Sequence, residues 1–169
     1  EFDKIIICAG AWSNELSLLV GDCFPLESER GYHIMYEQQE KRISRPVSWQ
    51  ERGTYFTPMD EGLRVGGVVE FGGKTKEINP KVIKFLQRTA KLLFPNIKEH
   101  YSEWVGLRPS MPDSVPVIGQ SPKNPYIYYC FGHQHVGWTL GGISGKLIAQ
   151  EVSANKTDID LKSFSAERF

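Results

Sequence analysis

The chain has 169 residues, of which 40% are hydrophobic and 24% charged, and its twenty Lys and Arg residues balance its twenty Asp and Glu residues. This composition is typical of a globular protein and lacks the basic surplus that a nucleic-acid-binding protein carries. No apolar run approaches the ~20 residues that a membrane-spanning helix needs. We therefore expect a globular protein with no nucleic-acid partner and no transmembrane segment.

The cysteines Cys8, Cys23 and Cys130 lie far apart in the sequence, with no CxxC spacing. This spacing argues against a zinc site and against a disulfide framework. We expect the three to be buried small hydrophobic residues of a protein from a reducing compartment.

The first segment predicts a strand followed by a short helix. Lys4–Cys8 is a β-branched run that predicts a strand buried on both faces, as in a parallel sheet. Ala11–Val20 predicts a short helix with Ser13 as its N-cap and with Leu16, Leu19 and Val20 on one face. The chain has no initiator Met and enters this strand almost at once, so we expect that a preceding segment is missing.

The middle of the chain predicts an antiparallel sheet. Turn residues at Met59–Gly62 separate two strand-like runs, so Thr54–Glu70 predicts a hairpin. The strand-like runs are Gly31–Tyr36, Val47–Gln50, Thr54–Thr57, Leu63–Val65 and Gly67–Glu70.

Two longer helices are predicted in the second half. Pro80–Phe94 carries an apolar stripe at helical spacing, with Asn79 as a plausible N-cap and Pro95 after its end. Trp138–Val152 carries a second stripe of four residues, Leu140, Ile143, Leu147 and Ile148.

Strands and loops lie between these helices. Ser102–Arg108 and Tyr126–Phe131 are strand candidates, and Pro109–Pro116 reads as a proline-rich loop. Strand-helix pieces at both ends and an inserted sheet between them predict an α+β fold, in which the chain leaves one domain, builds a second and returns. The expected boundaries are 1–24 and 106–152 for the first domain, 25–105 for the antiparallel sheet domain, and 153–169 for a C-terminal tail.

A glycine-rich turn between a strand and a helix is the strongest local signal. The run Phe131–Thr139 contains Gly132 and Gly137, which allow the backbone to approach a ligand closely. The first N–H groups of the following helix have no internal partner and lie at the positive end of the helix dipole, which favours an anion or an electron-rich carbonyl. A purely structural role for the turn remains open at this point. His133 and His135 lack a third ligand of suitable spacing, so we expect no metal site.

Arg108 is the second candidate for chemistry. It ends a strand candidate in an apolar and aromatic stretch, and its planar guanidinium is suited to bidentate binding of a carboxylate. The alternative is a structural salt bridge to Asp113 or Glu103. Tyr32, His33 and Tyr55 form a weaker third signal, because tyrosines in a sheet more often serve packing.

Five motifs in the same order resemble the FAD-dependent D-amino-acid oxidase/dehydrogenase superfamily, and most of all its bacterial D-amino-acid dehydrogenases. They are the strand before Ala9-Gly10-Ala11-Trp12-Ser13, Arg30-Gly31-Tyr32, Leu63–Glu70, Gly106-Leu107-Arg108-Pro109 with Pro112-Asp113, and Gly132-His133 with Gly137. The resemblance spans nearly the whole chain and implies an amine or amino-acid oxidoreductase in the cytoplasm, or at the periphery of the inner membrane. In this superfamily the ends of the chain would belong to the FAD-binding domain and the inserted sheet to the substrate-binding domain.

The resemblance also implies site residues. Arg108 matches the arginine that binds the substrate carboxylate, Tyr55 matches a pocket tyrosine, and Tyr32 and His33 are weaker substrate candidates. The implied cofactor-binding residues are Ala9, Gly10, Ala11, Gly106, Leu107, Gly132, His133, His135, Gly137, Trp138 and Thr139. The implied reaction passes the α-hydride of a D-amino acid to N5 of FAD, and the resulting imine is hydrolysed to a keto acid without an obligatory side-chain acid or base.

Two departures from the family pattern matter. The Gly-x-Gly-x-x-Gly motif for the ADP half of FAD is not found in this chain, so we expect the missing N-terminal segment to supply it and the chain alone to be inactive. Gly106–Met111 contains no cysteine, so we expect non-covalent FAD. The alternatives are an oxidase or dehydrogenase of the secondary-amine, sarcosine, glycine or proline type, and a flavin-free binding domain.

Overall fold

The structure is a computed structural model that describes residues 2–37 and 43–169. The chain divides into two compact units, one made of Glu1–Glu29 with Arg108–Phe169 and the other of Arg30–Leu107. Together they confirm the expected α+β fold class. Within the described ranges no helix combines the length and apolar character that a membrane crossing requires.

The first unit is built on a three-stranded sheet with the order β1-β8-β7. Strand β1 (Ile5–Ile7) pairs in parallel with β8 (Ile127–Phe131), and β7 (Val117–Gln120) pairs antiparallel with β8. Strand β7 was not predicted, because its four residues follow a proline-rich stretch and are too few to show an alternating pattern.

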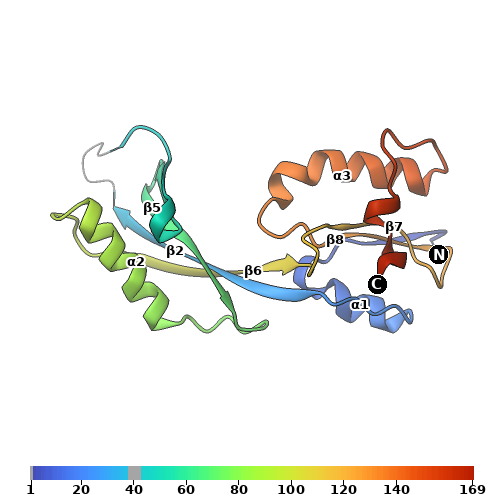
Figure 1. Cartoon of the computed structure of the whole chain (residues 1–169), viewed down its shortest axis with the longest axis horizontal. Coiled ribbons are helices and arrows are strands. Elements are labelled where there is room, and N and C mark those ends of the chain that lie inside the picture. Colours follow the sequence, from blue (N-terminus) through green and yellow to red (C-terminus); the bar gives the residue numbers. More distant parts are fainter. Residues whose placement is uncertain (1, 38–42) are drawn as a thin grey trace. The chain divides into compact units, whose positions relative to one another are not determined.

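Side chains of this sheet enter two hydrophobic clusters. Ile127, Tyr129 and Phe131 pack with Phe24 and Met111. The alternate residues of β8 face the opposite way, where Tyr128 and Cys130 pack with Ile148 of α3 (Gly137–Val152). Figure 1 shows α3 along one face of this sheet and α1 (Ser13–Leu19) on the other side.

Some burial predictions for this unit are wrong. Ile5 and Ile6 are 54% and 40% exposed because β1 is an edge strand of the described sheet. In α1 the buried side chains are Ser13 and Ser17, whereas Leu16 and Leu19 are exposed. Ser13 is the first residue of the helix rather than its N-cap.

The burial predicted for α3 and for the cysteines also needs correction. Leu147 and Ile148 are buried as expected, but Ile143 is 45% exposed. Cys8 and Cys23 are exposed, and Cys130 is only partly buried. Apolar periodicity identified the helices but not which face of each is covered.

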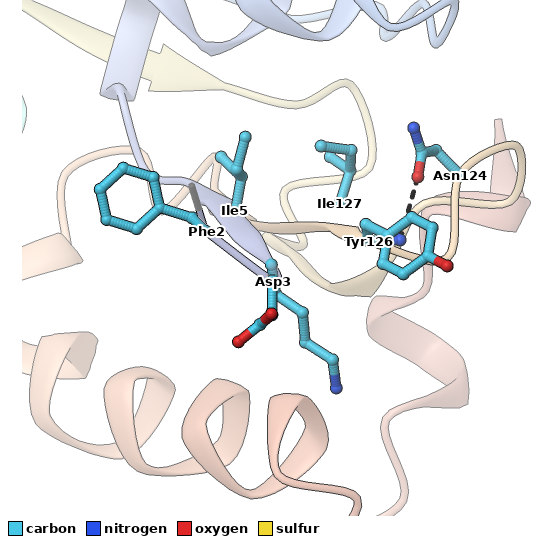
Figure 2. A pocket seen from close by; sticks show the side chains of 7 residues that line it. Phe2, Asp3, Ile5, Asn124, Tyr126 and Ile127 are labelled. Atoms are coloured by element: carbon cyan, nitrogen blue, oxygen red, sulfur yellow. Dashed lines mark hydrogen bonds between the residues drawn. The ribbon is translucent and has the colours of Figure 1, made fainter.

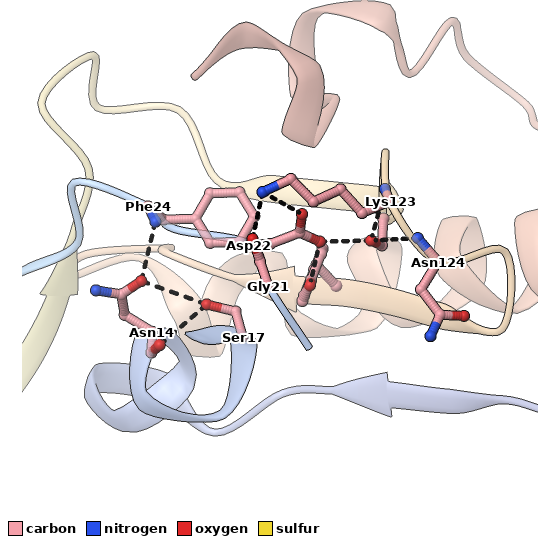
Figure 3. A network of polar contacts seen from close by, with 9 residues as sticks. Asn14, Ser17, Gly21, Asp22, Phe24, Lys123 and Asn124 are labelled. Carbon is pink, nitrogen blue, oxygen red and sulfur yellow. Dashed lines mark hydrogen bonds and ion pairs between the residues drawn. The ribbon is translucent and has the colours of Figure 1, made fainter. Parts of the chain in front are cut away.

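A buried polar network fixes the turn after α1 to the sheet of the same unit (Figure 3). The Asp22 carboxylate, 3% exposed, accepts hydrogen bonds from the hydroxyls of Tyr129, at 2.6 Å, and Ser121. Lys123 Nζ lies 3.9 Å from the second carboxylate oxygen. Burial, followed by the hydrogen bond to Asp22, raises the pKa of Tyr129 above its ordinary value, so the phenol remains a donor.

The second unit is built on a five-stranded sheet with the order β3-β4-β5-β2-β6. The strands are β2 (Glu27–Glu37), β3 (Val47–Trp49), β4 (Thr54–Met59), β5 (Gly62–Phe71) and β6 (Ser102–Ser110). Strands β4 and β5 pair antiparallel with Met59 opposite Gly62, which confirms the predicted hairpin. The two runs predicted as separate strands form the single strand β5, and β6 continues through Pro109.

Helix α2 (Pro80–Leu93) packs against one face of this sheet. The Asn79 side chain accepts a hydrogen bond from the Lys81 N–H at 3.0 Å, which confirms the predicted N-cap. Leu86 and Ala90 are fully buried against sheet residues that include Ile34, Phe56 and Val65. The opposite face of the sheet is therefore the one available for other roles.

Candidate functional site

Two candidate loops leave the same edge of the sheet in the first unit. Because β1 and β8 are parallel, with Ile7 opposite Tyr129, their carboxyl ends lie side by side. The turn Ala9-Gly10-Ala11 follows β1, and the loop Gly132–Gly137 follows β8. Ligands of open α/β sheets bind outside the carboxyl ends of the strands, so this edge is the natural candidate site.

The end of β6 is joined to the loop after β8 by backbone hydrogen bonds. Ser110 forms an isolated antiparallel bridge with His133, and the Gln134 N–H donates to the Pro109 carbonyl at 2.9 Å. Arg108 comes two residues before this bridge. The sequence motifs around Arg108 and Gly132, 24 positions apart, therefore meet within one unit.

Gly132 occupies a position that only glycine fits. Its φ is +86°, and a Cβ atom there would lie 2.7 Å from Cγ of Met111. Met111 is itself buried, at 3% exposure. The absence of a side chain at Gly132 thus allows the loop to pack closely on the segment that follows β6.

The amino-terminal end of α3 is open to a ligand. Its N-cap residue is Val136, no side chain accepts a hydrogen bond from its first turn, and that turn has no acidic residue. The first helical N–H groups, which include those of Trp138 and Thr139, therefore lack the capping partner that a polar side chain would provide. Such free donors at the positive end of a helix fit the electron-rich edge of a flavin ring.

His133 stabilises the loop from inside. Its Nε2 lies 2.9 Å from the Ser144 hydroxyl of α3, and burial lowers the pKa of the imidazole. His135 is exposed. Among residues 2–37 and 43–169 no group of three His, Cys, Asp or Glu side chains is arranged to hold a metal ion.

Arg108 does not form the salt bridge to Asp113 or Glu103 that was the structural alternative for this residue. Asp113 forms its ion pair with Arg168, at 2.7 Å, and Oε1 of Glu103 lies 2.8 Å from Nε2 of His100, within hydrogen-bond distance. Arg108 is partly buried, and its guanidinium forms no hydrogen bond or ion pair with the described part of the chain. A partly buried arginine without a carboxylate partner is suited to binding an anionic ligand.

The face of the five-stranded sheet opposite α2 carries the other candidates. Tyr55 is 53% exposed and lies opposite Gly66, while Thr57 lies opposite Arg64, so these residues share that face. His33 lies on β2 and stacks on Trp104, with ring centroids 4.8 Å apart. Burial, and then the nearby charge of Arg64, lower the pKa of His33, which favours the neutral ring.

Tyr32 lies in the packing of the second unit. It is 2% exposed, and its hydroxyl donates to the Glu70 carboxylate at 2.5 Å. Glu70 also accepts from the Asn79 amide at 2.5 Å and lies 3.3 Å from Arg30. These contacts account for the burial and the hydroxyl of Tyr32 within the unit itself. The contact of Tyr32 with substrate stays a prediction.

Gly106 is covered by an aromatic ring. A Cβ atom there would lie 1.9 Å from Cη2 of Trp104, so the indole lies over this glycine. The glycine thus serves the stacking of Trp104 on His33, and the cofactor contacts expected of Gly106 and Leu107 stay predictions.

Sequence reasoning assigned no role to Trp104, Arg64 or Met111. Each lies beside a residue that the sequence did indicate: Trp104 beside His33 and Gly106, Arg64 beside His33, and Met111 beside Gly132. Alternation along β6 places Trp104 on the same face of that strand as Arg108, which is a signal that the sequence already contained.

A hollow of about 490 Å³ lies at the opposite edge of the first unit's sheet (Figure 2). It is lined by the segment before β1, which includes Phe2, by Ile5 at the start of that strand, and by Tyr126 just before β8. Because the candidate loops leave the carboxyl ends of these two strands, this hollow is separate from the candidate site.

Comparisons with known proteins agree with this geometry. Residues 1–151 match the family of FAD-dependent oxidoreductases. The chain is 36% identical to a D-amino-acid oxidase of Bradyrhizobium diazoefficiens over 172 residues, which cover 99% of this chain and 41% of that protein. It is 31% identical to D-amino acid dehydrogenase 3 of Mesorhizobium japonicum over 160 residues, covering 90% and 39%.

Solved structures show the same relationship. The glycine oxidase of Geobacillus kaustophilus superposes with a TM-score of 0.89 at 25% identity, over 98% of this chain and 45% of that chain. The chain thus spans about two fifths of the length of the curated relatives it matches. On the match of residues 1–151, this chain belongs to the family of FAD-dependent oxidoreductases.

Proposed function

We propose that the chain is part of a flavin-dependent enzyme that oxidises the C–N bond of a D-amino acid. Family membership and the two curated relatives support this function. The observation on which the proposal mainly depends is Arg108, which is partly buried and has no side-chain partner in the described part of the chain. It lies two residues before Ser110, where the end of β6 is hydrogen-bonded to the loop after β8.

Arg108 would bind and orient the substrate carboxylate. A charge-assisted bidentate pair fixes both the position and the direction of a small amino acid. The guanidinium offers a planar fork of hydrogen-bond donors that matches a carboxylate, so the part of Arg108 is orientation. Tyr55, whose side chain is exposed on the open face of its sheet, is the second candidate for substrate binding, and His33 follows it; Tyr32, 2% exposed, is the weakest of the candidates.

The edge at the ends of β1 and β8 would hold the flavin without a covalent bond. When bound, FAD supplies the two-electron oxidation of the C–N bond. The free N–H groups at the start of α3 would stabilise negative charge on the pyrimidine side of the ring. Gly10, with φ of +55° and no atom within 4 Å of an added Cβ, leaves open space at the neighbouring turn.

The nucleotide-binding part of the enzyme would lie outside this chain. Ile5 and Ile6 of the edge strand β1 are exposed, and a further strand pairing with β1 would cover them. We propose that such a segment of the parent protein carries the ADP-binding motif. The unit formed by Glu1–Glu29 and Arg108–Phe169, except for Arg108 itself, is accordingly assigned to FAD, and Arg30–Leu107 to substrate.

Steady-state kinetics of the parent protein test the proposal. We expect Arg108→Met to raise KM for D-amino acids by a factor equivalent to ~2–4 kcal/mol, because a charge-assisted pair is lost. Arg88→Met is the matched control, since Arg88 is an exposed arginine of α2. An unchanged KM in Arg108→Met, or an equal change in both variants, would overturn the assignment. A panel that includes sarcosine and proline, which are secondary amines, and glycine, which has no α side chain, separates D-amino-acid oxidation from the alternative activities.

A further inference from the structure

Two cysteines that are distant in the sequence lie beside each other in the first unit. Strands β1 and β8 are in parallel register, ending with Ile7 opposite Tyr129. Continuing that register by one residue places Cys8 opposite Cys130. Neighbouring strands are about 4.8 Å apart, and the Cα atoms of a disulfide are commonly about 4.4–6.8 Å apart, so the spacing is suitable for a bond.

The two thiols also point to the same side of the sheet. Cys130 packs with Tyr128 and Ile148 on the face that α3 covers. Residues opposite each other in register project to the same face, so Cys8 shares it. In keeping with this placement, the pKa of Cys8 is lowered to about 7 by its neighbour Cys130, and that of Cys130 is raised.

Both thiols are free, and one of them is accessible in this chain, without the strand proposed to pair with β1. Cys8 is exposed, whereas Cys130 is partly covered by its neighbours. This arrangement resembles a reactive cysteine beside a resolving cysteine. Cys23 is also exposed and free, but the strand register places no cysteine opposite it, so it serves as an internal control.

We propose that Cys8 and Cys130 are a peroxide-sensitive dithiol site that closes to a disulfide. The Cys8 thiolate attacks one oxygen of hydrogen peroxide, the O–O bond breaks, and hydroxide leaves to become water, which gives a sulfenic acid on Cys8. The Cys130 sulfur then attacks the Cys8 sulfur, the S–O bond breaks, and the hydroxide leaves as water with the Cys130 proton. The two thiols lose two electrons in total and the peroxide gains them.

The disulfide would act at the candidate edge. Cys8 immediately precedes the turn Ala9-Gly10-Ala11, and Cys130 lies one residue before the end of β8. A bond between them would fix together the ends of the two strands from which both candidate loops emerge. Peroxide would thereby change the rigidity of the sheet edge that carries the turn Ala9-Gly10-Ala11 and the loop Gly132–Gly137.

Peptide mapping tests the proposal directly. The purified protein is treated with one equivalent of hydrogen peroxide, quenched in acid, alkylated and digested. We expect a disulfide-linked peptide pair containing Cys8 and Cys130, while Cys23 remains alkylated. The Cys23→Ser variant should give the same linked pair, and Cys8→Ser should give none. Oxidation of Cys23 at the same rate, or Cys8 sulfinic acid without the linked pair, would overturn the proposal.

A second measurement on the untreated wild-type protein avoids any effect of substitution on folding. Phenylarsine oxide forms stable adducts with two adjacent thiols. We expect one adduct per chain, with Cys8 and Cys130 protected from later alkylation and Cys23 still reactive. Failure to form the adduct on the reduced, folded protein would contradict the side-by-side placement of the two thiols.

Discussion

Replacing Gly132 with alanine should destabilise the first unit by more than its backbone conformation alone explains. A residue other than glycine at φ of +86° costs about 1–2 kcal/mol. The added Cβ would also lie 2.7 Å from Cγ of the buried Met111, and such overpacking typically costs about 1–3 kcal/mol. We therefore expect a total loss of about 2–5 kcal/mol by adding these two costs.

Gly21→Ala is the matched control for this prediction. Gly21 lies in the same unit with φ of +91°, and an added Cβ there would meet only Cδ of Lys123, at an ordinary 3.8 Å. It should carry the backbone cost alone. The difference between the two variants therefore measures the contact between Gly132 and Met111.

Urea unfolding gives the two free energies, and hydrogen exchange of amides in β7 and β8 assigns the loss to the first unit. A double-mutant cycle with Met111→Ala isolates the contact. In that background the cost of Gly132→Ala should fall to that of Gly21→Ala. Equal costs for Gly132→Ala and Gly21→Ala in the wild-type background would refute the close packing of this loop on the segment after β6.

Three further predictions concern named contacts. Asp22→Ala should cost about 3–5 kcal/mol in urea unfolding because it leaves buried hydroxyls without their acceptor, whereas Tyr129→Phe should cost about 1.5–3 kcal/mol; the reverse order would contradict the network in Figure 3. Hydrogen bonds from Tyr32 and Asn79 lower the pKa of Glu70, so its contribution to stability is present above the ordinary glutamate value of 4.5 and is lost as pH falls through the lower folded-state pKa. Glu70→Gln should therefore flatten the acid side of the stability profile, and an unchanged slope would count against that contact. Because the pKa of Cys8 is lowered to about 7, the pH profile of its alkylation rate should have its midpoint near pH 7, below the value of about 8.5 for a free cysteine thiol. A midpoint of about 8.5 would contradict the pairing of Cys8 with Cys130.

The sequence predicted elements whose signals are local. Asn79 before Pro80 identified the start of α2, because a capping side chain and a proline act within one turn. The turn at Asp60 and Glu61 identified the β4–β5 hairpin for the same reason. The order of five short motifs identified the family, although no one of them is specific by itself.

Predictions that depend on contacts between distant segments were less accurate. The exposure of Ile6 and Leu19 depends on which elements cover β1 and α1, and apolar periodicity does not reveal this. The partner of Asp113 could not be chosen from sequence, because Arg168 lies 55 positions away. The proximity of Cys8 to Cys130 likewise required the register of two strands separated by most of the chain.

The role of Arg108 is the central claim, and deletion of the substrate carboxylate tests it most directly. In the parent protein, kcat/KM is compared between wild type and Arg108→Met for a D-amino acid and for the amino alcohol that lacks its carboxylate. We expect the variant to lose about 30- to 1,000-fold on the amino acid, equivalent to ~2–4 kcal/mol, and to match wild type on the alcohol. An equal loss on both substrates, or no loss on the amino acid, would contradict the account.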